Sequence, residues 1–258
     1  MKEEIVQGDC VEVLKTLDSE SVDMVLTSPP YDDLRSYIEY DFDFPKTAFQ
    51  IVRILKPGGV CVWVVGDATS DGSESGSSFK QALLFMNLGL SLHDTMIYEK
   101  SGIPFPSSVR YNQCFEYMFV LSKGKPKTIN LIRDKKNVMA GESRKNTRQR
   151  TKDGWAESTG WEIADYGIRD NIWRYKTGMY KSTKDIAAFE HPAIFPEELA
   201  ADHITSWSSP GDLVLDPFNG SGTTTKMAKQ LGRRYMGIDI SEEYCEIARK
   251  RLEQGTLL

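Results

Sequence analysis

Long apolar runs, closely spaced cysteines and histidines are scarce in this 258-residue sequence. Its longest uninterrupted apolar run, residues 60–65, is too short to cross a bilayer, and no charged-then-apolar leader opens the chain. We therefore expect a cytoplasmic protein that does not act at a membrane. The four cysteines lie far apart and three histidines are present, which argues against a zinc site or another metal site and favours reduced thiols.

Charge is unevenly distributed along the chain. The net charge of −5 does not indicate a general nucleic-acid binder. Residues 122–190, however, contain 16 of the 32 Lys and Arg but only 9 of the 37 Asp and Glu, so this segment carries +7 and the remainder −12. A basic segment within an acidic protein is typical of a surface that binds a polyanion, although a solvated loop could carry the same charges.

Strand-like and helix-like segments alternate over most of the chain. Apolar segments predict strands at residues 4–7, 22–26, 60–65, 95–98, 115–121, 213–215 and 235–238. Helical spacing predicts helices at residues 10–17, 46–55, 79–88, 195–207, 223–231 and 242–253. This alternation predicts an α/β fold of the Rossmann-like kind, with a mostly parallel central sheet and helices on both faces.

Regular periodicity fades between residues 123 and 182, where Gly, Lys, Arg, Asn and Trp are mixed. This pattern predicts an irregular insertion with little core of its own. We divide the chain into residues 1–122 and 186–258, the two halves of one α/β domain, and an inserted region at 123–185. Its three tryptophans are interpreted as a small core, or alternatively as surfaces that stack on or wedge between bases: Trp155, Trp161 and Trp173.

A glycine-rich turn follows the strand predicted at 213–215. In the sequence DPFNGSGTT (216–224), Gly220 and Gly222 can adopt backbone angles closed to other residues and allow close approach to a ligand. The next strand ends at Asp239, where nucleotide-binding folds place an acid on ribose hydroxyls. The turn lacks a third glycine and a Gly-Lys-Ser/Thr ending, which argues against a nicotinamide oxidoreductase and an ATPase.

The strand predicted at 22–26 runs into a stiff loop, TSPPY (27–31). Its prolines prevent both helix and ladder pairing, and they leave the Ser28 hydroxyl and the Pro29 carbonyl as two acceptors. Two acceptors could hold both hydrogens of one amino group and free its nitrogen lone pair to attack a methyl donor. Tyr31 offers a flat face for a base that has left the helix. Taken alone, the loop could also be an ordinary turn with an exposed tyrosine.

Together, TSPPY at 27–31 and DPFNGSGTT at 216–224 resemble the motifs of the DNA amino-methyltransferases, which modify the exocyclic amino group of cytosine or adenine. The order of catalytic motif, basic insertion and cofactor motif looks like the permuted beta group of that family. The resemblance covers nearly the whole chain outside the insertion. It implies S-adenosyl-L-methionine as the cofactor, and double-stranded DNA with a flipped target base as the substrate.

The resemblance also assigns roles to matching positions. Catalysis is assigned to Ser28, Pro29, Pro30 and Tyr31. Cofactor binding is assigned to Asp9 and Cys10 beside the adenine, to Asp239 at the ribose, and otherwise to Asp216, Phe218, Gly220, Gly222, Thr223 and His191. Thr223 could be only a helix cap and His191 only a helix-entry residue. DNA contacts are assigned to Arg133, Lys135, Lys136, Arg144, Lys145, Arg148, Arg150 and Lys152, with some arginines reading guanine edges.

The target atom follows in part from single residues. No Pro-Cys pair occurs, which excludes methylation of ring carbon 5 of cytosine, because that reaction needs a cysteine nucleophile. Ser28 resembles the cytosine-amino enzymes, whereas adenine enzymes more often carry Asp or Asn there. We therefore expect a cytosine-N4 methyltransferase, with adenine-N6 as the alternative.

Other interpretations are more remote. The permuted order and the basic insertion argue against methylation of RNA or of a protein amide, and intact Ser28, Gly220 and Asp239 argue against a DNA-binding module without catalysis. A role in restriction-modification, a homodimer and a separate restriction endonuclease are all compatible with the beta group. No feature of the sequence decides among them.

Overall fold

The structure is a computed structural model of the chain. It describes residues 3–30, 43–102, 108–144, 148–157, 161–178, 181–186, 188, 194 and 196–254, without the side chains of residues 144, 148–150, 156–157 and 161. The chain divides into two compact units: unit 1 contains Met1–Asn130 and Asn171–Leu258, and unit 2 contains Leu131–Asp170.

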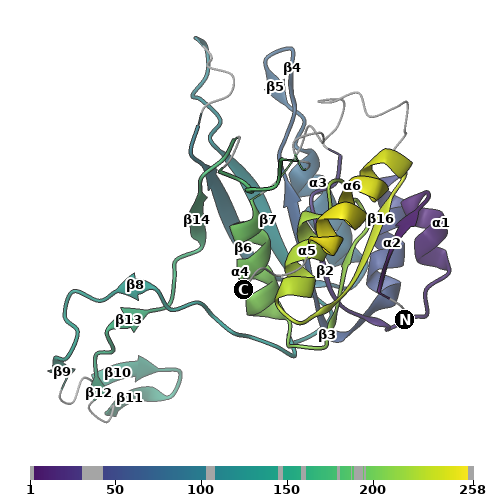
Figure 1. The fold of residues 1–258 in the computed structure, drawn as a ribbon. Coiled ribbons are helices and arrows are strands. Elements are labelled where there is room, and N and C mark those ends of the chain that lie inside the picture. Colours follow the sequence, from purple (N-terminus) through teal and green to yellow (C-terminus); the bar gives the residue numbers. More distant parts are fainter. Residues whose placement is uncertain are drawn as a thin grey trace. The chain divides into compact units, whose positions relative to one another are not determined.

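An eight-stranded sheet forms the centre of unit 1 (Figure 1). Its strands lie in the order β1 (Glu4–Gln7), β16 (Arg234–Asp239), β15 (Leu213–Asp216), β2 (Val22–Thr27), β3 (Leu55–Val65), β7 (Phe115–Ser122), β6 (Ser91–Lys100) and β14 (Ile172–Tyr175). Only β7 runs antiparallel to its neighbours. The predicted α/β fold with a mostly parallel sheet is confirmed.

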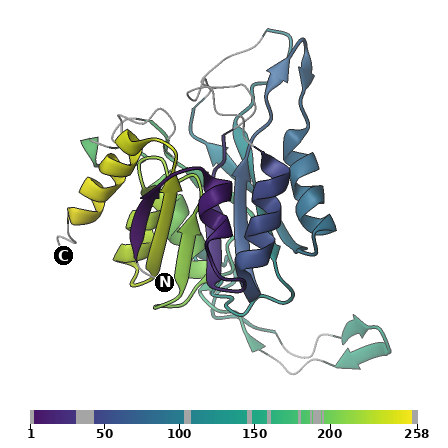
Figure 2. The same ribbon diagram turned by 90° about the vertical axis from the view of Figure 1, so that its right-hand side faces the viewer.

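Helices cover both faces of this sheet (Figures 1 and 2). One layer contains α1 (Cys10–Lys15), α2 (Phe44–Ile54) and α3 (Ser77–Asn87), and the other contains α4 (Glu197–Trp207), α5 (Thr223–Gln230) and α6 (Glu242–Glu253). Polar caps start several of them: Asp9 accepts from the Glu12 N–H in α1, and Ser241 accepts from the Tyr244 N–H in α6. No helix in the described part of the chain has both the length and the apolar character needed to cross a bilayer.

The main apolar core lies between the sheet and the first helix layer. Leu14, Ile51, Trp63 and Phe85 are fully buried there. Strands β2 and β15 are buried along their whole length, as expected for central parallel strands covered on both faces. These two strands therefore provide a rigid base for whatever follows their carboxyl ends.

Several element boundaries differ from prediction. Helix α2 ends at Ile54, before the predicted stop at residues 56–59, and the chain continues directly as β3. This strand starts at Leu55 rather than at residue 60, so it contains both glycines of the predicted stop. Gly59 allows this because a Cβ there would lie 2.9 Å from the Asp23 carbonyl oxygen of β2. The predicted loop at 66–78 contains a small hairpin, β4 (Thr69–Ser70) and β5 (Ser73–Glu74).

The end of the predicted insertion belongs to the central sheet. Strand β14 pairs in parallel with β6, and Trp173 and Tyr175 point to the buried side. The Trp173 ring lies 4.6 Å from that of His203 on α4. Trp173 is therefore a core residue of unit 1, and its interpretation as part of an insertion core was wrong. Four alternating residues were too short a pattern to identify an edge strand.

Unit 2 is a long, interrupted antiparallel hairpin. Its arms pair as β8 (Lys135–Lys136) with β13 (Tyr166–Gly167), β9 (Ser143–Arg144) with β12 (Trp161–Glu162), and β10 (Arg148–Thr151) with β11 (Gly154–Glu157). Ion pairs join its base, Lys135 to Asp170 at 2.7 Å and Arg169 to Asp134 at 2.5 Å. Trp155 is 70% exposed, so its interpretation as a core residue was also wrong.

Candidate active site

The site predicted from the sequence lies where the strand order reverses. From β15 the chain passes through α5 to β16 on one side, whereas from β2 it passes through α2 to β3 on the other side. Neighbouring parallel strands with diverging connections leave a crevice at their carboxyl ends, and open α/β sheets bind ligands there. The loop Ser28-Pro29-Pro30 follows β2 and the glycine turn follows β15, so both motifs lie at this end of the sheet, where such a crevice is expected.

Two hydrogen bonds join the motifs across a long stretch of sequence. The Thr27 hydroxyl donates to Asp216 Oδ1 at 2.6 Å, and the Thr224 hydroxyl donates to the Leu26 carbonyl at 3.3 Å. All of these groups are buried. Pro29 is buried and Ser28 partly exposed, so the loop is fixed at its root. These two bonds fix the position of the loop after β2 relative to the glycine turn after β15.

The glycine turn has the backbone geometry that its sequence predicted. Gly220 and Gly222 have φ values of 49° and 82°, in the left-handed region. A Cβ at Gly222 would lie 2.8 Å from the Ala248 Cβ of α6, so close packing also requires glycine there. The turn is therefore both strained for other residues and tightly held by the helix behind it.

Asp239 stands at the end of β16, beside the glycine turn. Its Oδ2 accepts from the Gly220 N–H at 2.8 Å, and its Oδ1 accepts from the Ser241 N–H at 2.9 Å. Burial raises its pKa, against the lowering effect of backbone hydrogen bonds. The Gly8 N–H donates to the Asp239 carbonyl at 2.9 Å, which brings Asp9 to the same edge. The predicted adenine and ribose residues thus neighbour each other.

Asp216 is a buried carboxyl group whose named partners are neutral. It accepts from the Thr27 hydroxyl and from the Phe218 N–H, the latter at 3.0 Å. Burial raises the pKa of Asp216 to about 6, because these hydrogen bonds do not fully offset the loss of solvation and because Asp239 adds negative charge. A buried acid next to a second acid favours a positively charged ligand.

These residues fit the cofactor that the resemblance implies. S-adenosylmethionine carries positive charge on its sulfur, which suits Asp216, and ribose hydroxyls that suit a carboxylate such as Asp239. In addition, Asn219 Nδ2 is buried without a hydrogen-bond partner among the described residues, directly within the turn. An unsatisfied buried donor at this turn is a polar group of the kind that a bound cofactor would satisfy.

Other predicted site residues are placed differently. The Cys10 side chain packs in the core, with its sulfur 3.5 Å from the Thr47 hydroxyl. Only the backbone of Cys10 can therefore take the predicted role beside the cofactor's adenine. Thr223 is buried and lies 3.4 Å from an Arg251 nitrogen. The Phe218 ring packs edge-on against that of Trp63, with 6.4 Å between the ring centroids. Tyr31 and His191 lie outside the described residues.

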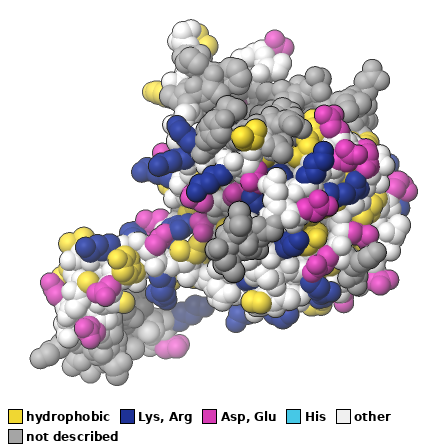
Figure 3. All heavy atoms as spheres, viewed as in Figure 1, with side chains coloured by type: hydrophobic (Ala, Val, Ile, Leu, Met, Phe, Trp, Pro, Cys, Tyr) yellow, Lys and Arg dark blue, Asp and Glu magenta, His cyan; other side chains and the backbone are white. Residues whose placement is uncertain are grey.

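The basic residues assigned to DNA are spread along unit 2. Arg133, Lys136 and Lys152 are exposed and form no ion pair with the described residues, whereas Lys135 is paired with Asp170. The side chains of Arg144, Arg148 and Arg150 are not described, and Lys145 lies outside the description altogether. In Figure 3, acidic and basic side chains are interspersed over the coloured surface of unit 1 seen from this side.

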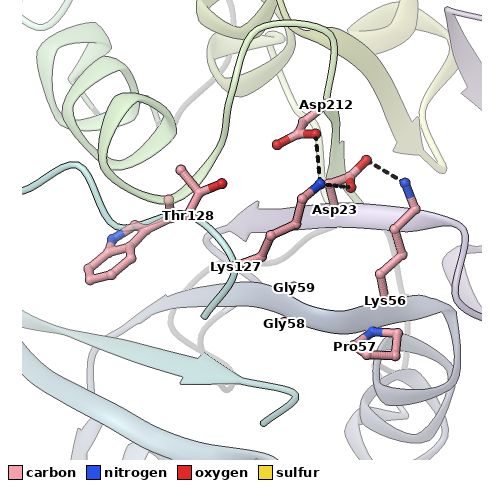
Figure 4. A pocket seen from close by; sticks show the side chains of 9 residues that line it. Asp23, Lys56, Pro57, Gly58, Gly59, Lys127, Thr128 and Asp212 are labelled. Atoms are coloured by element: carbon pink, nitrogen blue, oxygen red, sulfur yellow. Dashed lines mark hydrogen bonds and ion pairs between the residues drawn. The ribbon is translucent and has the colours of Figure 1, made fainter. Parts of the chain in front are cut away.

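A second charged cluster lies at the opposite, amino-terminal ends of β2 and β15 (Figure 4). Asp23 Oδ2 accepts from Lys56 Nζ at 2.8 Å and from the Leu213 N–H at 3.0 Å, and Lys127 lies 3.7 Å from Asp212. The cavity between them measures about 10 Å³, room for at most one water. This cluster anchors the chain rather than binding a substrate.

Sequence reasoning missed several residues of the site. Thr27 was treated only as part of a motif, and Asn219 only as a turn residue. Gly237 was not noticed, although a Cβ there would lie 2.5 Å from the Asn219 side chain. Arg251, which donates to the Ser221 carbonyl of the glycine turn, was missed as well. Its position among the buried residues of α6, beside Ala248 and Leu252, is the one pattern in the sequence that indicates a buried charge.

Comparisons with known proteins identify the family to which the chain belongs. A family model for DNA methylases of the N6/N4 group matches residues 22–250. The chain is 54% identical to the orphan methyltransferase M.BamHII of Bacillus amyloliquefaciens, over 100% of this chain and 94% of the relative. Solved structures also share the fold, among them the following two.

One is the PvuII DNA methyltransferase, described as cytosine-N4-specific, with a TM-score of 0.69, 22% identity and coverage of 98% of this chain and 87% of the other. The second is the M1.HpyAVI complex with S-adenosylmethionine, with a TM-score of 0.63 and 24% identity. The match covers 96% of this chain and 98% of the other. The chain therefore belongs to the N6/N4 family of DNA methylases, enzymes that depend on S-adenosylmethionine and methylate an exocyclic amino group.

Proposed function

We propose that this methylase acts on the N4 amino group of a flipped cytosine in double-stranded DNA. The main support is the position of Ser28-Pro29 at the crevice, held to the cofactor turn by the bond from Thr27 to Asp216. Serine at this position favours a cytosine amino group, and adenine-N6 is the alternative.

The chain's own residues position the reaction. Asp216, Asp239 and the glycine turn would hold S-adenosylmethionine, which supplies a methyl group on a positively charged sulfur when bound. The Ser28 hydroxyl and the Pro29 carbonyl each accept one hydrogen of the base's amino group. Holding both hydrogens turns the nitrogen lone pair out of the ring's conjugation and towards the methyl donor, so positioning supplies much of the rate. Tyr31 is proposed to stack on the flipped base.

The product identifies the target base. Mixed-sequence duplex DNA is incubated with enzyme and methyl-labelled cofactor, digested to nucleosides and analysed by mass spectrometry. We expect labelled N4-methylcytosine. Labelled N6-methyladenine would overturn the choice of base while leaving the mechanism in place, and label confined to RNA or protein would overturn the substrate.

We further propose that unit 2 recognises DNA. It is a two-stranded ribbon, a shape that the major groove admits, and it carries exposed basic residues along its arms together with the exposed Trp155. A homodimer stays a prediction, to be checked by sedimentation. The name of the 54% identical relative describes an orphan enzyme, which favours a modifier without an endonuclease of its own.

Neutralising basic residues of unit 2 should weaken DNA binding in a salt-dependent way. The variant Arg133→Gln/Lys136→Gln/Lys152→Gln is expected to lower DNA affinity and to reduce the slope of log K against log salt by about 0.9 for each phosphate that is no longer neutralised. Fluorescence anisotropy over a salt series measures this slope. Lys250→Gln, an exposed lysine on α6, is the control. Equal slopes in parent and triple variant would exclude these residues from the DNA interface.

Removing the Asp239 carboxylate should weaken cofactor binding. Asp239→Ala is expected to raise the Kd for S-adenosylmethionine about 10- to 100-fold, because hydrogen bonds to a charged group contribute roughly 1.5–3 kcal/mol. Isothermal calorimetry measures the Kd. Asp212→Ala is a matched control, since Asp212 also accepts from a backbone N–H, that of Ser209, but at the opposite ends of the strands. An unchanged Kd for Asp239→Ala would refute the assignment.

A further inference from the structure

Four charged side chains meet behind the glycine turn. Lys226 Nζ lies 2.6 Å from Asp185 Oδ2 and 2.8 Å from Glu197 Oε1. Arg251 Nε lies 3.1 Å from the same Asp185 oxygen, and its Nη2 lies 2.7 Å from the same Glu197 oxygen. Each cation thus contacts both carboxylates, and the four charges cancel.

This cluster, which we call the charge quartet (Asp185, Glu197, Lys226 and Arg251), is shielded from solvent. The Arg251 side chain is 0% exposed and that of Lys226 10%. Burial raises the pKa of Asp185, but hydrogen bonds from Lys226 and Arg251 outweigh it, so the pKa lies below its usual value. Buried charges are tolerated only when their partners are in place, so the arrangement is specific.

One arm of Arg251 reaches past the quartet into the glycine turn. Its Nη1 donates to the Ser221 carbonyl at 2.6 Å and lies 3.2 Å from the Ser221 hydroxyl. Ser221 lies between Gly220 and Gly222, which both have left-handed backbone angles. The contact therefore orients the peptide group that joins Ser221 to Gly222. Glycine gives the turn little stiffness of its own, and the orientation must therefore come from outside.

We propose that Arg251 is a positioning residue for cofactor binding, and that Asp185, Glu197 and Lys226 hold its guanidinium in place. The planar fork of arginine spreads its donors over a fixed geometry, so that one guanidinium contacts two carboxylates and a carbonyl in different directions. Arg251 acts through Ser221 and does not touch the cofactor. The proposal rests on the assignment of the glycine turn to S-adenosylmethionine.

The test separates the contact to Ser221 from the charge balance. Arg251→Met leaves the quartet with one negative charge too many, whereas Arg251→Met/Asp185→Asn restores neutrality without restoring the donor to Ser221. Both variants are compared with the parent by thermal unfolding, and by calorimetric Kd for S-adenosylmethionine at a temperature well below each Tm.

We expect the single variant to lose Tm and to bind the cofactor about 10- to 100-fold more weakly, as when the outer partner of a ligand-binding group is removed. The double variant should regain Tm while its Kd stays raised. If the double variant recovered both Tm and Kd, the proposal would be overturned, because the charge imbalance alone would then account for the weaker cofactor binding of Arg251→Met. If Arg251→Met does not fold, Arg251→Lys keeps the charge but not the fork, and a parental Kd for it would equally overturn the proposal.

Two further variants complete the design. Arg233→Met removes another buried arginine, whose donors go to the Ser208 and Leu231 carbonyls away from the turn, and it should lower Tm without changing Kd. Asp239→Ala tests the turn itself. An unchanged Kd in Asp239→Ala would mean that the turn assignment fails, whereas a raised Kd there with a parental Kd in Arg251→Met would mean that the positioning role alone fails.

Discussion

Replacing Ser28 by alanine should lower kcat on duplex DNA about a hundredfold, since loss of a group that fixes the reacting geometry costs on the order of 10²-fold. The Kd for S-adenosylmethionine should stay close to that of the parent, because the glycine turn and Asp239 follow other strands. Single-turnover methylation at saturating cofactor measures the first quantity, and calorimetry the second.

The control for this variant is Ser21→Ala, which removes a serine at the other end of the same strand. The Ser21 hydroxyl donates to the Asp18 carbonyl at 2.7 Å, far along the strand from the crevice, so its loss should leave kcat unchanged. If Ser28→Ala instead abolished cofactor binding at unchanged kcat, the division of roles between the two motifs would be wrong.

The variant Asp216→Asn should be more stable than the parent at neutral and alkaline pH. The folded-state pKa of Asp216 is about 6, above the ordinary value of 3.8. Below pH 3.8 the group is protonated in both the folded and the unfolded chain, and no penalty arises. Between pH 3.8 and about 6 the unfolded chain ionises while the buried carboxyl stays protonated, so stability falls across this window, by about 3 kcal/mol at most, and the loss is complete above about pH 6.

Asparagine keeps an oxygen acceptor for the Thr27 hydroxyl and avoids this loss. Thermal unfolding should therefore show a gain of roughly 5 °C at about pH 8 and little gain at about pH 3.5, below the pKa of the unfolded chain. The comparison is between the two proteins, because Asp239 also has a raised pKa and remains in both. A gain of equal size at both pH values would mean that burial of the charge is not its cause.

The same substitution should weaken cofactor binding, since it removes the negative charge that a cationic ligand would meet. Stability gained at the expense of binding is the usual sign that an unfavourable group is kept for function. Calorimetric Kd values for Asp216→Asn would show the effect directly, and an unchanged Kd would place the positive charge of the cofactor elsewhere.

The sequence predicted those parts of the site that depend on local backbone chemistry. Prolines at 29 and 30 and glycines at 220 and 222 restrict or extend backbone angles independently of context, so both loops were found at strand ends. Alternation of strands and helices predicted the parallel sheet, because such a pattern has few ways to bury its apolar faces.

Contacts between distant segments could not be predicted in this way. The bond from Thr27 to Asp216 spans 189 positions, and that from Arg251 to Asp185 spans 66. Which strands become neighbours depends on the whole topology, and no local pattern marks a threonine hydroxyl as the donor. Trp173 shows the same difficulty, since its burial depends on a helix that follows it in the chain.

Two asparagines mark the borders of unit 2. Asn130 donates from its backbone and side chain to the Ser206 and Thr205 carbonyls, at 2.9 and 3.1 Å, and Asn171 is held by Thr95 and Ile97. The two points at which unit 2 leaves and rejoins unit 1 are therefore both fixed by hydrogen bonds to residues of unit 1, independently of the sequence between them. If unit 2 recognises DNA as proposed, replacing the hairpin between these two fixed junctions would change the recognition sequence and leave the site in unit 1 as it is.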